Sequence, residues 1–324
     1  MRALTAHFGL RVLVVASFVS ALEAAPPRPA TFSIVAADPE AGEVGVAVAS
    51  RFFAVGAVVP WARAGVGAVA TQANANTTFG PRGLELLAQG LTPEEAVQVL
   101  LRTDDGNNAR QVGIVSAAGE STTYSGPGCN SWAGGRRGPG YAAQGNILAG
   151  EKVVVAMEAA FLASKGKPLA ERLYAALKAG DEAGGDSRGK QSAAIVVCRA
   201  RAGFNGFNDR AVDIRVDDSP EPFVEIGRLL GMALVNDSWN RGWTAFTEKR
   251  FPEALAAQER AAAQSEAQPG MLPEVLYDLA VIRLANGDKP GALAAVRRAI
   301  QLNPKLVVQA RGDSDLAALR GELP

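Results

Sequence analysis

The hydrophobic pattern of residues 31–50 predicts a β-hairpin at the start of the first globular region. Residues 31–37 and 43–50 are rich in Val, Ile and Ala, and the turn sequence Asp38-Pro39-Glu40-Ala41-Gly42 separates them. Two apolar runs joined by a Pro/Gly turn are typical of paired antiparallel strands. Further runs of this kind predict strands at residues 57–60, 67–72, 111–117, 121–125, 141–148, 193–199 and 211–216.

Helices are predicted in pairs between these strands. Thr92, with Glu95 three residues later, forms the sequence of a capping box. The predicted helical segments are residues 79–89, 92–103, 151–164 and 168–179. Because strands and helix pairs alternate in blocks and not as strict βαβ repeats, we predict an α+β fold. In this fold two sheets pack face to face with helices outside, which gives a four-layer αββα sandwich.

The composition changes near Val235, where a Gly-rich, β-branched region passes into one rich in Ala, Leu, Glu and Arg. Together with the length, this change predicts a sandwich domain at residues 31–235 and a small all-α domain at residues 236–324. A helix at residues 223–235 is expected to connect the two.

The second domain contains an internal repeat. The segment 250–257 recurs as 288–295, and each copy opens a helix that follows another helix. This spacing resembles a tetratricopeptide-like unit of about 34 residues. Since about three such units are usually needed for an independent solenoid, we expect this pair to dock on the first domain or on a second subunit. Its role is either a groove that binds a peptide or protein partner or a structural cap.

Residues 1–30 have the pattern of an export signal. Residues 1–11 form a basic n-region that contains Arg2 and Arg11. An apolar run follows at residues 12–22, and small residues come after it. The run is shorter than the about 20 residues of a membrane span, so no stable span is expected once the leader is removed. Cleavage is expected after Ala21 or Ala24. We therefore predict an exported protein, periplasmic or secreted; the alternative is a disordered or anchored N-terminus.

The charge balance excludes some classes of partner. The chain has 33 basic and 33 acidic residues, so no net field attracts nucleic acid or an acidic membrane surface. Two cysteines are too few for a disulfide scaffold, although Cys129 and Cys198 could pair in an oxidising compartment. Cys198 ends an apolar run and is expected in the core, whereas Cys129 lies in a Gly/Pro-rich loop.

Histidine is absent after the leader, because the only one is His7. This excludes Ser-His-Asp and Cys-His catalysis and histidine-based metal sites in a mature chain, and no metal or cofactor is predicted. A different proton acceptor is available at Thr31, where the first strand pattern begins. If Thr31 were the first residue, its own α-amine could take the proton of its hydroxyl. The alternative is that Thr31 simply begins a strand, as β-branched residues often do, and Ser33 on the same face is a weaker candidate.

Several segments of the first domain resemble a known family. They are Thr31-Phe32-Ser33-Ile34-Val35-Ala36, residues 46–56, 67–73, 80–83 and 144–148, and Gly184-Gly185-Asp186-Ser187-Arg188-Gly189-Lys190-Gln191-Ser192-Ala193-Ala194. Over about residues 31–230 the sequence resembles the domain of unknown function 1028 family. That family is placed with the N-terminal-nucleophile (Ntn) hydrolases, whose αββα sandwich agrees with the predicted block order. Many members begin with Met-Thr-Phe-Ser-Ile, whereas this sequence carries a leader before Thr31.

The resemblance implies roles for particular residues. Thr31 would be the nucleophile, and a nearby cation would lower the pKa of its α-amine. In proteasome-like relatives a lysine does this; Arg63 is the positional match and Arg51 the alternative. The turn at residues 72–78, with Gln72 and Asn74, offers N–H groups to a developing oxyanion; its alternative is an ordinary loop that caps the next helix.

The segment 184–192 places a carboxylate, a guanidinium, an amide and a hydroxyl in one glycine-permitted turn. Asp186, Arg188, Gln191 and Ser192 are expected to orient the amine or bind substrate; the alternative is a surface turn with a local Asp186–Arg188 contact. The glycine-rich segments 65–67 and 134–140 match no phosphate-binding pattern and are predicted to be turns.

The sequence thus favours an exported Ntn-type hydrolase that cleaves an amide C–N bond of a small amide or peptide through an acyl-enzyme on Thr31. The alternative is a non-catalytic protein on the same fold, which binds a peptide or an envelope protein. The sequence leaves the oligomeric state open, a homo-oligomer included, and gives no substrate identity.

Overall fold

The computed structural model describes residues 31–323 and contains two antiparallel sheets. The larger sheet has six strands in the order β10-β9-β2-β1-β8-β7. Its strands are β1 (Thr31–Asp38), β2 (Glu43–Ser50), β7 (Gly134–Gly138), β8 (Tyr141–Asn146), β9 (Ser192–Arg199) and β10 (Arg210–Val216). Strands β1 and β2 form the predicted hairpin, with Thr31 opposite Ser50 and Asp38 opposite Glu43. Strand β1 therefore lies inside the sheet, between β2 and β8.

The smaller sheet has four strands in the order β3-β4-β5-β6. They are β3 (Pro60–Arg63), β4 (Gly67–Ala73), β5 (Arg110–Ser116) and β6 (Ser121–Ser125). Val35, Val46 and Val48 of the larger sheet share one buried cluster with Ala68 and Val115 of the smaller one. The two sheets are therefore packed face to face.

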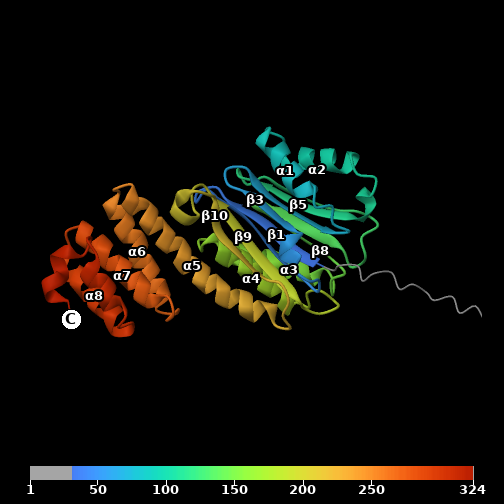
Figure 1. The fold of residues 1–324 in the computed structure, drawn as a ribbon. Helices are drawn as coiled ribbons and strands as arrows, with labels where there is room; N and C mark the ends of the chain where they lie inside the picture. Colours follow the sequence, from blue (N-terminus) through green and yellow to red (C-terminus); the bar gives the residue numbers. More distant parts are fainter. Residues whose placement is uncertain (1–30, 324) are drawn as a thin grey trace, which may run out of the picture.

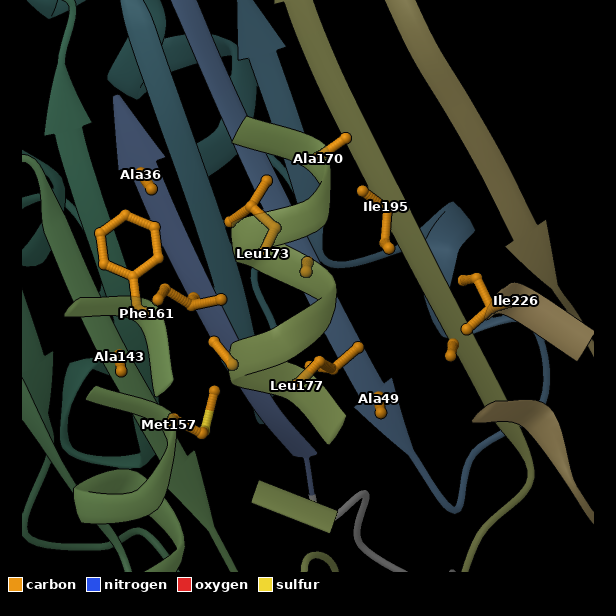
Figure 2. Close-up of a cluster of buried hydrophobic side chains, with 14 of the residues drawn as sticks. Ala36, Ala49, Ala143, Met157, Phe161, Ala170, Leu173, Leu177, Ile195 and Ile226 are labelled. Carbon is orange, nitrogen blue, oxygen red and sulfur yellow. The ribbon is translucent and has the colours of Figure 1, made fainter. Parts of the chain in front are cut away.

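Helices cover the outer face of each sheet (Figure 1). Helices α3 (Lys152–Ala163) and α4 (Leu169–Glu182) pack on the larger sheet, and α1 (Phe79–Ala88) and α2 (Pro93–Arg102) pack on the smaller one. Figure 2 shows Leu173 and Leu177 of α4 among side chains of the larger sheet such as Ala49 and Ile195. The predicted α+β arrangement of two antiparallel sheets with helices is confirmed.

The capping box at Thr92 is also confirmed. The Thr92 side chain accepts a hydrogen bond from the Glu95 amide, and the Glu95 carboxylate accepts one from the Thr92 amide at 2.9 Å. These two bonds satisfy N–H groups that the first turn of α2 would otherwise leave open.

The rest of the described chain is helical. It comprises α5 (Pro222–Thr247), α6 (Phe251–Ser265), α7 (Leu272–Ala285), α8 (Lys289–Leu302), α9 (Leu306–Gly312) and a final 3₁₀ helix (Ala317–Glu322). Both copies of the internal repeat begin helices, α6 and α8. The predicted domain boundary at 235/236 falls inside α5, which runs without a break from the larger sheet to the helical region (Figure 1). Val235 already belongs to the apolar core of that region, so one helix serves both cores.

Two predicted segments differ from the structure. The glycine-rich residues 134–138, predicted as a turn, form edge strand β7, which pairs with β8. Backbone pairing and ion pairs from Arg136 to Glu158 and from Arg137 to Glu94 override the low strand propensity of glycine there. The strand predicted at 57–60 is a 3₁₀ turn, Val55–Ala57, followed by β3 from Pro60.

No helix within residues 31–323 is long and apolar enough to span a membrane. The predicted leader and its cleavage positions lie outside the described residues.

Candidate functional site

The layer between the two sheets is apolar over most of its length and polar at one end. Along β1, Phe32 and Ile34 face helices α3 and α4, whereas Val35 faces the smaller sheet. Alternation along the strand places Thr31 and Ser33 on the same side as Val35, between the sheets. Both side chains are buried: Thr31 is 1% exposed and Ser33 is 0% exposed.

Polar residues form a row across the larger sheet at this end. The register places Ser50 and Asn146 on either side of Thr31, and Ser192 on the far side of Ser50. The Thr31 hydroxyl donates to Ser50 Oγ at 3.2 Å. Ser192 does not bond to Thr31. Its hydroxyl donates to the Phe52 carbonyl and accepts from the Val55 amide, so it holds the segment that follows β2.

A second polar row lies opposite, on the smaller sheet, where Gln72, Gln111 and Ser125 are register neighbours. Gln72 connects the two rows. Its Oε1 accepts from the Ser33 hydroxyl at 2.6 Å, and its Nε2 lies 3.3 Å from the Thr31 carbonyl and 2.8 Å from Gln111 Oε1. The main chain of Thr31 is therefore held from the facing sheet.

Gln111 is the centre of the cluster and is fully buried. Its Oε1 accepts from Gln72 and also from Asn146 Nδ2 at 2.9 Å. Its Nε2 donates to Ser125 Oγ and the Gly145 carbonyl, each at 2.7 Å, and to a third acceptor in β7. One amide thus fixes Asn146, the neighbour of Thr31, relative to both sheets.

Gln144 completes the group that we call the amide cluster: Thr31, Ser33, Ser50, Gln72, Gln111, Gln144 and Asn146. The Gln144 Nε2 donates to the Ser33 hydroxyl at 2.7 Å, while its buried Oε1 has no hydrogen-bond partner. That oxygen points at Gly113 of β5, where an added Cβ would come within 2.2 Å of it. Glycine at this position makes room for the amide.

A buried carboxylate lies beside the start of β1. Asp186, 6% exposed, accepts from the backbone amide of Arg51 at 2.7 Å, and Arg51 directly follows the Thr31 neighbour Ser50. Arg188 Nη2 lies 2.9 Å from Asp186 Oδ2, and its backbone amide also donates to that carboxylate. Arg51 Nη1 donates to the Arg188 carbonyl at 2.6 Å. The contact predicted between Asp186 and Arg188 is present, and it is buried on the carboxylate side.

The structure does not bring every predicted residue to this place. Arg63 pairs with Gly67 at the other end of β4, five residues from Gln72, or about 16 Å along the strand. Its guanidinium donates to the Leu84 carbonyl of α1, on the outer face of the smaller sheet. Arg63 therefore does not contact Thr31. Its distance from Thr31 along the chain matches that of the lysine in proteasome-like relatives, but that distance does not determine where Arg63 lies in the sheet.

Asn74 and Gln191 also lie outside the amide cluster. Asn74 is exposed just after β4, and its backbone carbonyl accepts from Arg110. The Gln191 side chain donates to Asp218 at 3.1 Å, beyond the end of β10. Sequence reasoning missed Ser50, Gln111, Gln144 and Asn146. Their signal is a polar residue near the end of an otherwise apolar strand face, one each in β2 and β5 and two in β8.

The chemistry available here comes from hydroxyls and neutral amides. Within residues 31–323, no group of three or more His, Cys, Asp or Glu side chains is placed to hold a metal ion. Both cysteines are free thiols. Burial raises the pKa of the Cys198 thiol to about 12, and burial also raises the pKa of Cys129, so neither is an activated nucleophile. The cluster can orient a hydroxyl and offer N–H donors.

The fold and this cluster define a two-sheet α+β protein with a buried hydroxyl and amide site at the start of its central strand. The chain belongs to a family of unknown function, DUF1028, whose model matches residues 31–226. It is similar to the crystal structure of protein SPO2555 from Silicibacter pomeroyi, of the same family, with 32% identity and a TM-score of 0.57. That similarity covers 63% of this chain and 89% of the other. A comparison with curated proteins gave no match.

Proposed function

We propose that this protein is an exported Ntn-type hydrolase that cleaves an amide C–N bond of a small amide or peptide through Thr31. The observation that carries the proposal is the position of Thr31. It begins an interior strand, its hydroxyl points into the inter-sheet layer, and its neighbours on both sides and on the facing sheet are hydrogen-bonding side chains. A threonine that only begins a strand needs no such surroundings.

The α-amine of a chain that begins at Thr31 would be the base. A hydroxyl attacks a carbonyl efficiently only when a base accepts its proton. Histidine is absent from the described residues, and Asp186 is already engaged by Arg188 and the Arg51 amide. The amine is fixed near its own hydroxyl by covalent geometry and has an ordinary pKa of about 7.7 to 8.0, close to neutral pH.

The amides would stabilise the developing negative charge. Hydroxyl attack on the substrate carbonyl forms a tetrahedral oxyanion, and the leaving amine then takes the proton held by the α-amine. Asn146 Nδ2 is a fixed donor beside Thr31, and Gln111 fixes its orientation. Ser50 lies on the other side, 3.2 Å from the Thr31 hydroxyl. Donors held in advance stabilise an oxyanion without reorganisation. Arg51 and Arg188, at the rim, would bind a polar or anionic part of the substrate.

The proposal requires a free Thr31, and this gives its test. We would determine the N-terminus of the exported protein by mass spectrometry and prepare a chain that begins at Thr31. That chain is expected to hydrolyse members of a panel of small amides and short peptides. It should also form a cyclic adduct with a peptide epoxyketone, which needs both the hydroxyl and the free amine of one residue. A chain that keeps residues 22–30 should do neither.

Variants separate chemistry from stability. Thr31→Val removes the hydroxyl and keeps the shape, so activity should fall to background, while Thr31→Ser should retain part of it. Thr122→Val is a matched control, because Thr122 is 3% exposed but lies on the outer face of the smaller sheet, bonded to Glu94 of α2. Activity retained in Thr31→Val, or full activity with upstream residues still attached, would refute the proposal.

A second candidate function rests on a groove in the helical region. The groove has a volume of about 320 Å³ between α6, α7 and α8, and Ala262, Leu276 and Leu279 are among the residues that line it. Ion pairs from Arg283 to Glu259 and from Arg298 to Glu266 flank it. We propose that it would accept a short peptide or a segment of another protein. Fluorescence anisotropy with a peptide library tests this, with Leu279→Gln as the variant expected to lose binding.

A further inference from the structure

Five arginines surround a cavity between the sandwich and the helical region, away from the Thr31 site. The cavity has a volume of about 460 Å³ and is formed by the end of β9, by α5 and by α6. The segments that form it are labelled in Figure 1. Its arginines are Arg199, Arg201, Arg241, Arg250 and Arg260. Such a concentration of one side chain in one cavity needs a physical explanation.

Two of the arginines are neutralised by structural ion pairs. Arg199 lies 2.5 Å from Glu43 and 2.6 Å from Asp237, and Arg241 reaches the same two carboxylates at 3.2 and 3.1 Å. Glu43 belongs to β2 and Asp237 to α5. These four charges balance and join α5 to the larger sheet. The role of this pair of arginines is therefore structural.

Two more are balanced near the surface. Arg201 pairs with Glu248, and Arg250 pairs with both Glu248 and Glu253. These side chains are substantially exposed, so the pairs are weak and their guanidinium groups keep free N–H donors. They raise the donor density of the cavity without adding net charge.

Arg260 has no such balance. It projects from α6, is exposed, and lies within 4.0 Å of no carboxylate among residues 31–323, although it lines the cavity. With four carboxylates against five guanidinium groups, the cavity carries one positive charge in excess. A guanidinium presents paired N–H donors whose geometry matches a carboxylate or phosphate.

Small apolar residues line the same cavity. Ala202, Ala245, Ala256 and Ala257 leave room that longer side chains would fill, and they present methyl groups to whatever enters. A free inorganic anion would use the charge and leave this surface uncovered. An organic anion with a short apolar body would use both.

We propose that this cavity binds a small organic anion, with its carboxylate or phosphate group at Arg260 and a short apolar body against the alanines. Nothing in this inference depends on Thr31 or on hydrolysis. Thr31→Val is therefore expected to leave the binding unchanged, so the two proposals fail independently.

Titration calorimetry with the full chain at low ionic strength tests the proposal. The probes are acetate, butyrate and hexanoate, with propyl phosphate and inorganic phosphate as the second headgroup series. We expect saturable binding whose affinity rises by about fourfold for each methylene group buried. The headgroup series that binds more tightly identifies the natural anion as a carboxylate or a phosphate.

Two substitutions of the same kind give the control. Arg260→Gln should weaken hexanoate binding by about tenfold, because it removes the unbalanced guanidinium and breaks no ion pair. Arg102→Gln, an exposed arginine at the end of α2, should leave the affinity unchanged. Ala257→Leu should weaken hexanoate more than acetate, since it occupies the apolar surface.

Three results would overturn the inference. One is the absence of saturable binding for every probe, and another is an equal loss of affinity in Arg260→Gln and Arg102→Gln. The third is an affinity that does not change with chain length, since that would describe a simple inorganic anion site.

Discussion

The substitution Gln111→Met tests the amide cluster as a unit. Methionine has nearly the length and flexibility of glutamine, so the change removes hydrogen bonds and leaves little cavity. Gln111 makes five hydrogen bonds to other residues, and three of the partner groups are buried: Gln72 Nε2, Asn146 Nδ2 and the Gly145 carbonyl. The substitution leaves these three groups without that partner.

The magnitude follows from the number of buried groups. A buried polar group that loses its partner costs about 1 to 3 kcal/mol. Gln72 Nε2 keeps longer contacts to the Thr31 carbonyl and the Gln144 carbonyl, so its loss is at the low end. Burial of the methionine thioether offsets about 1 kcal/mol. We expect the free energy of unfolding to fall by about 4 kcal/mol, a large share of the roughly 5 to 15 kcal/mol of a typical domain.

Gln258→Met is the matched control. Gln258 is equally buried, but its side chain makes one hydrogen bond, from Nε2 to the Val275 carbonyl at 3.0 Å, and its Oε1 has no partner. Replacing it removes one bond and also removes an unsatisfied acceptor. We expect a loss of about 1 kcal/mol or less.

Equilibrium unfolding in urea at pH 7 measures both variants, and far-UV circular dichroism confirms that each one folds. The two glutamines are equally buried and differ in how many hydrogen bonds they make. Equal losses in the two variants, or a loss below about 1 kcal/mol for Gln111→Met, would show that the amide cluster is not a cooperative unit.

Three further predictions concern charges and thiols. Asp186→Asn should lower the free energy of unfolding by about 2 kcal/mol in urea melts, because it replaces charge-assisted hydrogen bonds by neutral ones; an unchanged midpoint would contradict this. Hydrogen bonding from Arg110 holds the pKa of Asp104 well below its ordinary 3.8, so this contribution is complete above that pH and is lost as the pH falls below it. Asp104→Asn should therefore cost about 2 kcal/mol at pH 7 and progressively less in acid, and a constant difference across that range would be inconsistent with the pairing. Iodoacetamide at pH 8 should label Cys129 slowly and Cys198 not at all until the protein unfolds; mass spectrometry reports both, and equal labelling of the folded protein would contradict the burial argument.

Sequence patterns predict the strands of this fold better than they predict what meets between them. The hairpin of residues 31–50 and the capping box at Thr92 depend on neighbours in the chain, and both agree with the structure. The amide cluster forms only because the two sheets pack face to face. No local sequence pattern indicates that Gln72 and Gln111 point toward Thr31. Arg63 illustrates the same limit. Its distance along the chain predicted a cation beside the Thr31 amine, but Arg63 pairs with Gly67 at the far end of β4.

The site itself suggests where the electrostatic help for a Thr31 amine would come from. The sequence-based hypothesis required a cation beside the amine, and Arg63 is too far away to supply it. Arg51 and Arg188 lie next to the start of β1. Asp186 accepts from the Arg188 guanidinium and from the backbone amide of Arg51, whereas the Arg51 guanidinium donates to the Arg188 carbonyl. If Thr31 were the first residue, the Arg51 guanidinium and the low polarity of a buried layer would favour the neutral form of its amine, and we expect both to lower the pKa of that amine. Arginine stays protonated and would take no part in proton transfer, so in the proposed mechanism the hydroxyl proton would pass to the amine alone.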